Sequence, residues 1–461
     1  MKKITNNISI ISIIYLTIPL ICFYFGWLKL PIAIISSIIT IFSSYKIYKS
    51  LNKNEIKTNK KKQIIFWLTA IILIILWVYL SSIGEFSYQR KDSYVRVPLF
   101  HDLINYKWPL KYNISNNDIA FIYYLSWWLP ICVISKIFNL SMNISNLLLL
   151  IYSIIGILLI VYEMNCYLKK NSYIGLILLI LFSGLDILSL SFKNTELIKI
   201  EWWTNLFQYT SNTSLLYYCF NQAIPIWLIS ILILRLKDNK SIFALFSLVF
   251  VYSPWSIYGL IPISIYIIIK NIKNIKELIT IENIIQPLLI LIIYGSYYLT
   301  NNGNVHYNII FKPIIYLVFI LLEVGIYFII IHHKHKDYPY YYPVLIMLLL
   351  APIIYSYPHG NNFTMRSTTI PLFFLMIYII LFLENKKIKL KLKLLLIFFL
   401  VIGSIVPLLE FSNSFTKPIK YKQTNSFNNL NNINKKQIKT IKDQFFAYNY
   451  KNKFFFKYLS K

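Results

Sequence analysis

Residues 64–118 read IIFWLTAIILIILWVYLSSIGEFSYQRKDSYVRVPLFHDLINYKWPLKYNISNND. The first part, residues 64–83, is an apolar run long enough to span a bilayer, for which about 20 residues suffice. The second part, residues 84–118, is a polar insert that is dense in acidic, basic and aromatic side chains. Because further apolar runs surround it, we predict that this insert is a loop held at a membrane surface.

The composition indicates a membrane protein. The chain has 461 residues, of which 57% are hydrophobic, and its mean hydropathy is +0.59. A soluble protein of this length could not bury so much apolar surface, and the continuous runs differ from the short alternating strands of a membrane β-barrel. The predicted fold class is an all-α, polytopic transmembrane helical bundle of about 11–13 spans with a structured first extracytoplasmic loop.

The basic residues predict the orientation of the bundle. The formal net charge is +29, and many lysines lie in short loops between apolar runs, such as residues 46–62 and 386–393. The positive-inside rule assigns these loops to the cytoplasm. This predicts a multi-pass protein of the cell membrane with a cytoplasmic N-terminus. The rule also explains the positive charge, so no nucleic-acid partner is expected.

These assignments divide the chain into two parts. Residues 1–409 form the predicted transmembrane domain, with residues 84–118 as its first outer loop. Residues 410–461 form a polar C-terminal tail that is predicted to lie outside the cell, either as a small folded cap or as an amphipathic segment on the membrane surface.

Two stretches are harder to assign from hydropathy. Residues 118–145 have both ends outside, which fits either a re-entrant or interfacial segment or two short spans broken near Pro130. Residues 241–269 are predicted to form two short helices that turn at Pro254, since proline interrupts a helix.

The first outer loop holds the candidate catalytic residues. Transfer of a group to a hydroxyl needs a carboxylate, as general base or as ligand of a divalent metal, and a lipid-phosphate leaving group needs a cation to balance its charge. Asp92 is the main candidate for both roles of the carboxylate, with Mg or Mn as the metal. We predict Asp92, Glu85 and Asp102 as catalytic residues, and Arg96 and His101 as substrate-binding residues. The alternative is a loop whose charges simply face water.

Later polar segments supply five more candidate substrate-binding residues. Asp186 follows an apolar run, where an ionisable group is a functional candidate. Glu201, Trp202 and Gln222 combine carboxylate, indole and amide groups that suit a sugar, although paired tryptophans are often interface anchors. Arg366 lies at the start of a span, where it either snorkels to the surface or binds a phosphate.

Other features suggest no site. The four cysteines lack metal or redox spacing. Glu323 lies inside an apolar run without an obvious partner. His332, His333 and His335 have metal-like spacing but no nearby carboxylates to complete a metal site.

Several different short motifs lie along the chain. They are Gly84-Glu85-Phe86-Ser87-Tyr88-Gln89, Asp92, His101-Asp102-Leu103-Ile104, Trp108-Pro109, Ser183-Gly184-Leu185-Asp186, Glu201-Trp202-Trp203, Asn221-Gln222 and Asn361-Asn362-Phe363-Thr364-Met365-Arg366. Together they resemble the motifs of bacterial and archaeal multi-pass proteins similar to GT-C glycosyltransferases. The resemblance implies a large first outer loop with an essential acidic residue, which corresponds to Asp92, and a polyprenyl-phosphate sugar donor. Ser93 stands where the pattern has Trp, and Asn362 stands where it has Asp, which weakens a metal role for that last motif.

The predicted function is transfer of a sugar from a polyprenyl-phosphate-linked donor to a cell-surface acceptor on the outer face. The expected partners are this lipid and the membrane, and the oligomeric state stays open. One alternative is a transporter or flippase of lipid-linked saccharides, which would carry polar groups at the bilayer midplane. Others are a polysaccharide polymerase or ligase of a different fold, and a non-catalytic membrane protein, whose first-loop charges would scatter rather than converge.

Overall fold

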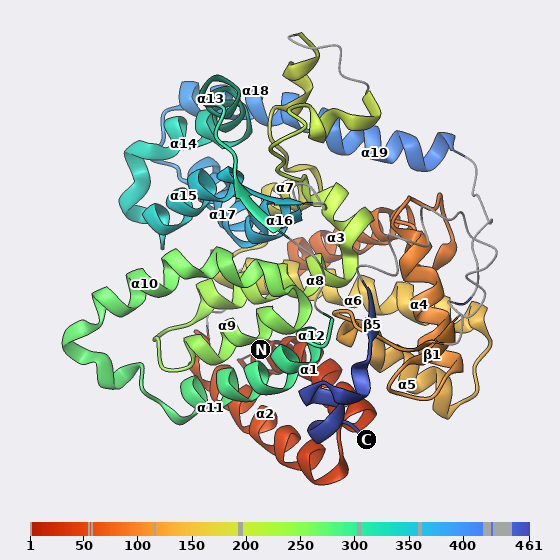
Figure 1. The fold of residues 1–461 in the computed structure, drawn as a ribbon. Helices are drawn as coiled ribbons and strands as arrows, with labels where there is room; N and C mark the ends of the chain where they lie inside the picture. Colours follow the sequence, from red (N-terminus) through yellow and green to blue (C-terminus); the bar gives the residue numbers. More distant parts are fainter. Residues whose placement is uncertain are drawn as a thin grey trace.

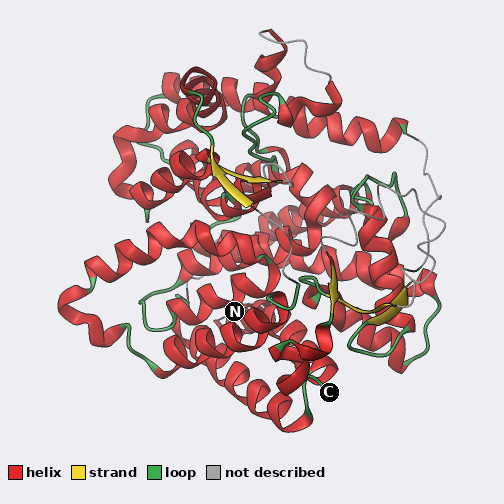
Figure 2. Ribbon diagram, in the orientation of Figure 1, coloured by secondary structure: helices red, strands yellow, loops and turns green. Residues whose placement is uncertain are grey.

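The fold is known from a computed structural model, in which residues 2–53, 56, 59–114, 117–191, 197–301, 306–357, 362–417, 426 and 445–461 are described. The chain forms an all-α bundle with two small sheets at its edges (Figure 1, Figure 2). This confirms the predicted fold class.

The α-helices follow one another along most of the chain. They are α1 (Lys2–Trp27), α2 (Leu30–Ser50), α3 (Lys60–Tyr79), α4 (Ser93–Asn105), α5 (Leu129–Ile137), α6 (Met142–Leu168), α7 (Tyr173–Leu181), α8 (Asn212–Arg235), α9 (Ile242–Tyr252), α10 (Ile261–Lys270), α11 (Ile281–Ile290), α12 (Ser296–Tyr298), α13 (Pro313–Ile320), α14 (Ile326–Ile331), α15 (Tyr341–Leu350), α16 (Asn362–Ser367), α17 (Thr369–Glu384), α18 (Leu390–Gly403) and α19 (Ile405–Thr416).

Short helical turns and strands connect them. The 3₁₀ turns used below are η1 (Ile83–Glu85), η2 (Ser126–Trp128), η3 (Asp186–Ser191), η4 (Leu197–Trp202), η5 (Pro254–Leu260) and η9 (His332–Asp337), and a π-helical turn, η8 (Leu321–Gly325), joins α13 to α14. Strands β1 (Lys111–Ile114), β2 (Asn117–Phe121) and β5 (Phe446–Tyr448) form one antiparallel sheet, and β3 (His306–Ile309) pairs with β4 (Ile354–Tyr357) in another.

Within the described residues, seven helical segments are long and apolar enough to cross a membrane, judged by length and composition. They are Ile8–Trp27, Leu30–Ser50, Lys60–Tyr79, Met142–Leu168, Asn212–Arg235, Pro313–Asp337 and Leu390–Thr416. The shorter apolar helices are Ser126–Ile137, Ile242–Tyr252, Pro254–Lys270, Tyr341–Ile353 and Thr369–Glu384. The predicted 11–13 spans therefore include several helices that are shorter than a full bilayer crossing.

The outer helices expose aliphatic side chains, as expected where lipid replaces water. In α3, Ile64, Leu68 and Ile72 are 57–65% exposed on one side of the helix. In contrast, 94% of the apolar stretch of α8 is buried inside the protein, and this helix packs against α6, α9 and α17. The bundle is therefore built around α8, which carries polar residues into its centre.

Prolines lie at helix starts in the two stretches that hydropathy left open. Ser126–Ile137 is one short helical stretch in which Pro130 lies in the first turn of α5, a position that proline tolerates. This stretch is not divided into two helices at Pro130. In the second region, α9 ends at Tyr252 and η5 begins at Pro254, as the proline predicts.

Two apolar runs leave the helical conformation before they end. In residues 173–190 the helix stops at Leu181; beyond it, the N–H of Asn212 donates to the carbonyl of Phe182 and the N–H of Leu185 donates to the carbonyl of Leu322. In residues 343–357 the chain ends in β4, which pairs with β3.

The C-terminal tail returns to the first loop. The boundary predicted at residues 409 and 410 lies inside α19, which continues to Thr416. Strand β5 pairs with β2, at the end of the first loop, and returns the tail to this part of the chain (Figure 1). The buried ring of Phe455 packs against Tyr297 at a centroid distance of 5.1 Å. Ser460 forms a bridge with Leu28 at the end of α1. The described part of the tail is thus a folded cap on the same end of the bundle as the first loop.

Candidate functional site

A sharp turn after α3 positions the start of the first loop. Ser82, Gly84 and Glu85 all have positive φ angles of 66–75°. A Cβ atom at Gly84 would lie 2.7 Å from the carbonyl oxygen of Asn146, so only glycine fits against the start of α6. This turn delivers Glu85 to the inner side of α4.

Glu85 is held by two polar partners. Its Oε1 lies 3.0 Å from Nε2 of His101 and accepts a hydrogen bond of 3.0 Å from Asn146 Nδ2. Burial tends to raise the pKa of Glu85, but these hydrogen bonds and the charge of His101 outweigh burial and hold the pKa below its ordinary value. Two of the predicted residues, Glu85 and His101, are therefore brought together as a pair.

Asp92 stands at the N-terminus of α4 and is the most exposed carboxylate of the site. Its side chain is 45% exposed, and Oδ2 lies 3.2 Å from Nη2 of Arg96, one turn further along the helix. Arg96 itself is buried, and its guanidinium also donates to Sγ of Cys219 at 3.5 Å and faces the ring of Phe220. A buried cation thus lies beneath an accessible anion.

The bend in α8 makes room for this guanidinium. Cys219 leaves the helical region with φ −142° and ψ 36°, and Pro225 lies six residues later in the same helix. A proline clashes with the carbonyl four residues before it and removes one helical hydrogen bond, which favours such a bend.

Arg366 reaches the same place from α16. Its Nε donates to Oε1 of Gln222 at 2.8 Å, and its Nη1 donates to Oδ1 of Asn362 at 2.6 Å. Gln222 Oε1 also accepts from Ser253 Oγ at 3.2 Å, and Ser256 Oγ donates to the carbonyl of Arg366 at 2.8 Å. The break between α9 and η5 thereby holds the side chain of Gln222 and the backbone of Arg366.

The two arginines share their surroundings. Burial tends to lower the pKa of each guanidinium, but nearby groups raise it, and for both arginines these groups are Cys219, Asp92, Tyr123 and Tyr124. We call Asp92, Arg96, Cys219, Gln222, Arg366, Tyr123 and Tyr124 the Asp92 cluster. It combines two permanently charged guanidiniums with one carboxylate. The cluster therefore carries an excess positive charge, which suits an anion such as a phosphate.

The surroundings of Asp92 do not suit a divalent metal. Among the described residues, no three His, Cys, Asp or Glu side chains lie close enough together to hold a metal ion. The ion-pair partner of Asp92 is the guanidinium of Arg96, whose positive charge would repel a metal cation. We therefore derive no chemical step through Mg or Mn.

Two predicted residues serve the fold. Asp102 is fully buried and accepts a hydrogen bond of 2.7 Å from the hydroxyl of Tyr112 in β1, so it anchors α4 to the sheet. Oε1 of Glu201 accepts from the backbone N–H of Ser211 at 3.1 Å and from Ser214 Oγ at 2.8 Å, which caps α8. Trp202 is 45% exposed, as an interfacial anchor would be.

Asp186 meets a partner that the sequence did not reveal. Asp186 and Glu323 are both buried, their carboxyl groups are in hydrogen-bond contact, and Trp203 Nε1 donates to Glu323 Oε1 at 3.4 Å. Gly184 packs directly against the Glu323 side chain. Two carboxyl groups this close cannot both ionise, so the pair holds one proton. This pair is separate from the Asp92 cluster.

Some site residues gave no signal in the sequence. Cys219 reads as a small core residue, and Tyr123 and Tyr124 belong to a tyrosine-rich composition of 38 tyrosines. Their roles depend on contacts between segments that are far apart in the chain.

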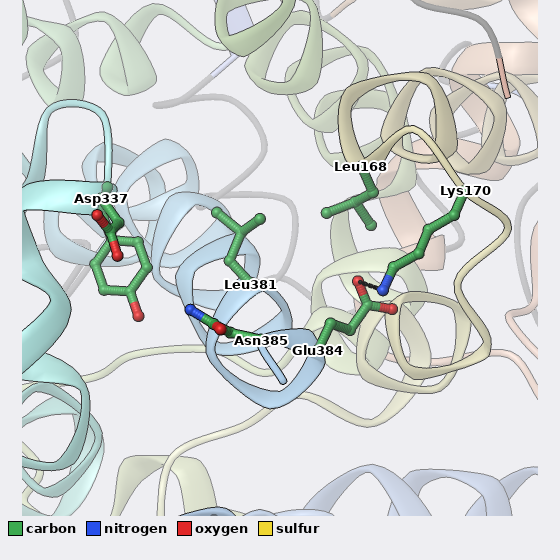
Figure 3. Close-up of a pocket in the computed structure, with 7 residues that line it drawn as sticks. Leu168, Lys170, Asp337, Leu381, Glu384 and Asn385 are labelled. Carbon is green, nitrogen blue, oxygen red and sulfur yellow. Dashed lines mark ion pairs between the residues drawn. The ribbon is translucent and has the colours of Figure 1, made fainter. Parts of the chain in front are cut away.

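A cavity of about 290 Å³ lies at the opposite end of the bundle, between the ends of α6 and α17 and the end of η9. Figure 3 shows the ion pair of 3.1 Å between Lys170 and Glu384 at one side of this cavity, with Asp337 on the other side. The cavity is lined by none of the predicted site residues.

No protein-family model matches the chain, no curated protein is detectably similar to it, and no solved structure matches its fold. The site therefore has to be interpreted from its own geometry.

Proposed function

We propose that the protein is a membrane glycosyltransferase of the GT-C type, which transfers a sugar from a polyprenyl-phosphate-linked donor to a cell-surface acceptor. The observation that carries this proposal is the Asp92 cluster. It combines one accessible carboxylate with the buried guanidinium of Arg96 and the half-buried Arg366, which come from separate segments of the chain. A solvated loop would not gather its charges around α8.

In the proposed reaction, the acceptor hydroxyl attacks the anomeric carbon of the donor sugar. The bond between this carbon and the phosphate oxygen breaks, and its electron pair stays on the phosphate. Asp92 takes the proton of the attacking hydroxyl as general base. Arg96 and Arg366 balance the charge that develops on the leaving phosphate.

The ion pair between Asp92 and Arg96 fits this sequence of events. An incoming phosphate competes with Asp92 for Nη2 of Arg96, because a phosphate is also a strong partner for guanidinium. Donor binding therefore frees the Asp92 carboxylate to act as general base on the acceptor hydroxyl. Glu85, held by His101 and Asn146, is the second carboxylate on this side of α4.

The charge distribution supports an outward orientation of the site. Arg235 at the end of α8 forms a buried ion pair with Glu163 of α6 and donates to the carbonyl of Asn52, next to the lysine-rich segment of residues 46–62. The contact between Lys170 and Glu384 brings residues 386–393 to the same end. By the positive-inside rule this end is cytoplasmic. The Asp92 cluster at the other end then faces outward in the cell membrane, and the N-terminus is cytoplasmic.

The proposal is tested by transfer of a radiolabelled sugar in proteoliposomes. The donor is a polyprenyl phosphate carrying one sugar, and the acceptor is a cell-envelope extract. We expect Asp92→Asn to reduce transfer by at least about 10²-fold, the usual contribution of a general base. Asp118→Asn is the matched control, because Asp118 lies in the same loop but forms an exposed pair with Lys451. Full transfer by Asp92→Asn, with an unchanged melting temperature, would reject the proposal.

A second candidate function is a proton-coupled transporter or flippase of lipid-linked saccharides. The observation that favours it is the carboxyl pair of Asp186 and Glu323, since Glu323 lies within the apolar segment Pro313–Asp337 and buried acidic pairs serve proton relays. This function predicts that Glu323→Gln stops movement of the saccharide across vesicles while Asp92→Asn does not. The glycosyltransferase proposal predicts the reverse dependence for sugar transfer.

A further inference from the structure

A small cavity lies beneath α4, next to the Asp92 cluster. It measures about 20 Å³, which is enough for one water molecule or one group of similar size. Its walls come from the first loop, from η2 and from the starts of α6 and α8. The residues that matter for the argument are Glu85, Gln89, Arg96, Trp128, Asn146 and Phe220.

Three buried polar atoms in these walls have no hydrogen-bond partner among the described residues. They are Oε1 of Gln89, Nε of Arg96 and Nε1 of Trp128. Gln89 and Arg96 are each 7% exposed, and Trp128 is fully buried. A buried polar group without a partner costs about 1–3 kcal/mol, so three of them around one cavity indicate that a polar group belongs there.

The three atoms match a hydroxyl group. The nitrogens of Arg96 and Trp128 each donate a hydrogen bond, and Oε1 of Gln89 accepts one. A hydroxyl has two acceptor lone pairs and one donor hydrogen, so a single hydroxyl can satisfy all three atoms. The amide of Gln89 is oriented by its own contacts, because Nε2 donates to the carbonyls of Ser87 at 2.8 Å and Ser82 at 3.3 Å.

Arg96 connects this cavity to the proposed reaction site. Its Nη2 contacts Asp92 and Cys219, and Arg96 is also one of the residues that line the cavity. The same side chain therefore borders both the cavity and the carboxylate of Asp92. The edge-on rings of Trp128 and Phe220, 5.8 Å apart, give the cavity an apolar side against which the C–H groups of a sugar can pack.

We propose that the cavity binds one hydroxyl group of the sugar on the lipid-phosphate donor. This inference rests on the proposed function and adds the residues that recognise the sugar: Gln89 and Trp128 bind its hydroxyl, and Arg96 binds the hydroxyl and the phosphate together. It also predicts that the protein distinguishes the sugar-bearing lipid from the bare lipid phosphate.

The test compares the affinities of two kinds of probe for the full chain in detergent. The first is a short-chain polyprenyl phosphate, and the second is its glucosyl, galactosyl and mannosyl esters. We expect at least one ester to bind about tenfold more tightly than the bare phosphate, as one well-placed set of hydrogen bonds provides. Trp128→Phe keeps a smaller aromatic ring but removes the indole N–H, and should reduce this preference about five- to tenfold without changing the affinity for the bare phosphate.

Two further variants complete the test. Gln89→Met should have the same effect as Trp128→Phe, and the tryptophan variant decides the question if Gln89→Met does not fold. Trp227→Phe is the matched control, because Nε1 of Trp227 is also buried without a described partner but does not line this cavity. This control should leave the preference unchanged.

The outcomes separate this inference from the proposed function. Suppose that the bare phosphate binds in a manner that depends on Arg366. If no ester is then preferred, or if Trp128→Phe leaves the preference intact, the cavity holds only water and the inference is wrong. If neither kind of lipid binds, both the inference and the proposed function are rejected. A preference that is lost in Trp128→Phe and kept in Trp227→Phe supports the inference.

Discussion

Substitution of three arginines near the first loop should have two different effects, one on stability and one on lipid binding. Arg90 is a structural clamp: its side chain is 1% exposed, and it donates to Oε2 and the carbonyl of Glu410, to Oγ of Ser414 and to the carbonyl of Leu80. Arg96 instead pairs with the partly exposed Asp92, and Arg366 bonds the amide oxygens of Gln222 and Asn362. The first arrangement stabilises the fold, and the second is suited to an external anion.

The magnitudes follow from these contacts. Arg90→Gln leaves Glu410 without its cation, and breaking a largely buried pair costs about 3–5 kcal/mol. Arg96→Gln and Arg366→Gln each leave Asp92 with one guanidinium nearby, so we expect a change in stability within about 1 kcal/mol. A charge-assisted hydrogen bond to phosphate contributes about 1.5–3 kcal/mol, so each of these two variants should bind polyprenyl phosphate about 10- to 150-fold more weakly.

Two measurements on the same purified samples check this. The melting temperature in detergent should fall clearly for Arg90→Gln and little for the other two variants. The affinity for polyprenyl phosphate should fall for Arg96→Gln and Arg366→Gln and remain for folded Arg90→Gln. The double variant of Arg96 and Arg366 should be non-additive, because both side chains would contact one phosphate. If both variants bind the lipid as the unsubstituted protein does, the anion site does not exist.

Three further predictions concern the fold around the site. Burial, and to a smaller extent the neighbouring Asp186, raises the pKa of Glu201 from its ordinary 4.5 to about 8. The contribution of Glu201 to stability is therefore complete below about pH 4.5 and is lost as the pH rises towards 8. The melting temperature should fall over this pH range, and Glu201→Gln should flatten the dependence of the melting temperature on pH. Gly84→Ala should lower the melting temperature, since it combines a positive φ with a contact of 2.7 Å to Asn146, whereas Gly295→Ala, whose nearest neighbour would be 3.4 Å away, should be tolerated. Phe455→Ala should destabilise the protein by about 3–5 kcal/mol in thermal or denaturant unfolding, because its buried ring fills the space between the tail and Tyr297; an unchanged melting temperature would mean that the tail does not dock.

Hydropathy and charge were sufficient to predict the bundle and most helix positions, because lipid exposure demands continuous apolar runs. They could not predict where α7 ends. Residues 173–190 are almost uniformly apolar, and the helix stops at Leu181 because the backbone of Leu185 bonds to Leu322 and that of Asn212 bonds to Phe182. Such contacts join segments that are more than 25 residues apart, and no local pattern records them.

The predicted site was recovered in part for a similar reason. His101 and Asp102 are neighbours in the sequence, but consecutive residues of a helix point about 100° apart. His101 therefore faces Glu85, while Asp102 faces Tyr112 in the sheet. The sequence could identify the loop that carries the charged residues. Only the fold distinguishes those that line the proposed site from those that stabilise the structure.

The charge balance around the arginines gives the remaining argument for a functional cluster. Arg90 with Glu410 and Arg235 with Glu163 are one-to-one pairs in which a buried cation meets a single carboxylate. Such neutral pairs need no external partner. Arg96 pairs with the half-exposed Asp92, whereas Arg366 forms no ion pair with any carboxylate in the described part of the chain. One positive charge there has no counter-charge of its own, close to a buried thiol and two tyrosines. Keeping this excess charge partly out of water is unfavourable unless an anion arrives, and the exposed side of Asp92 is where the anion can enter.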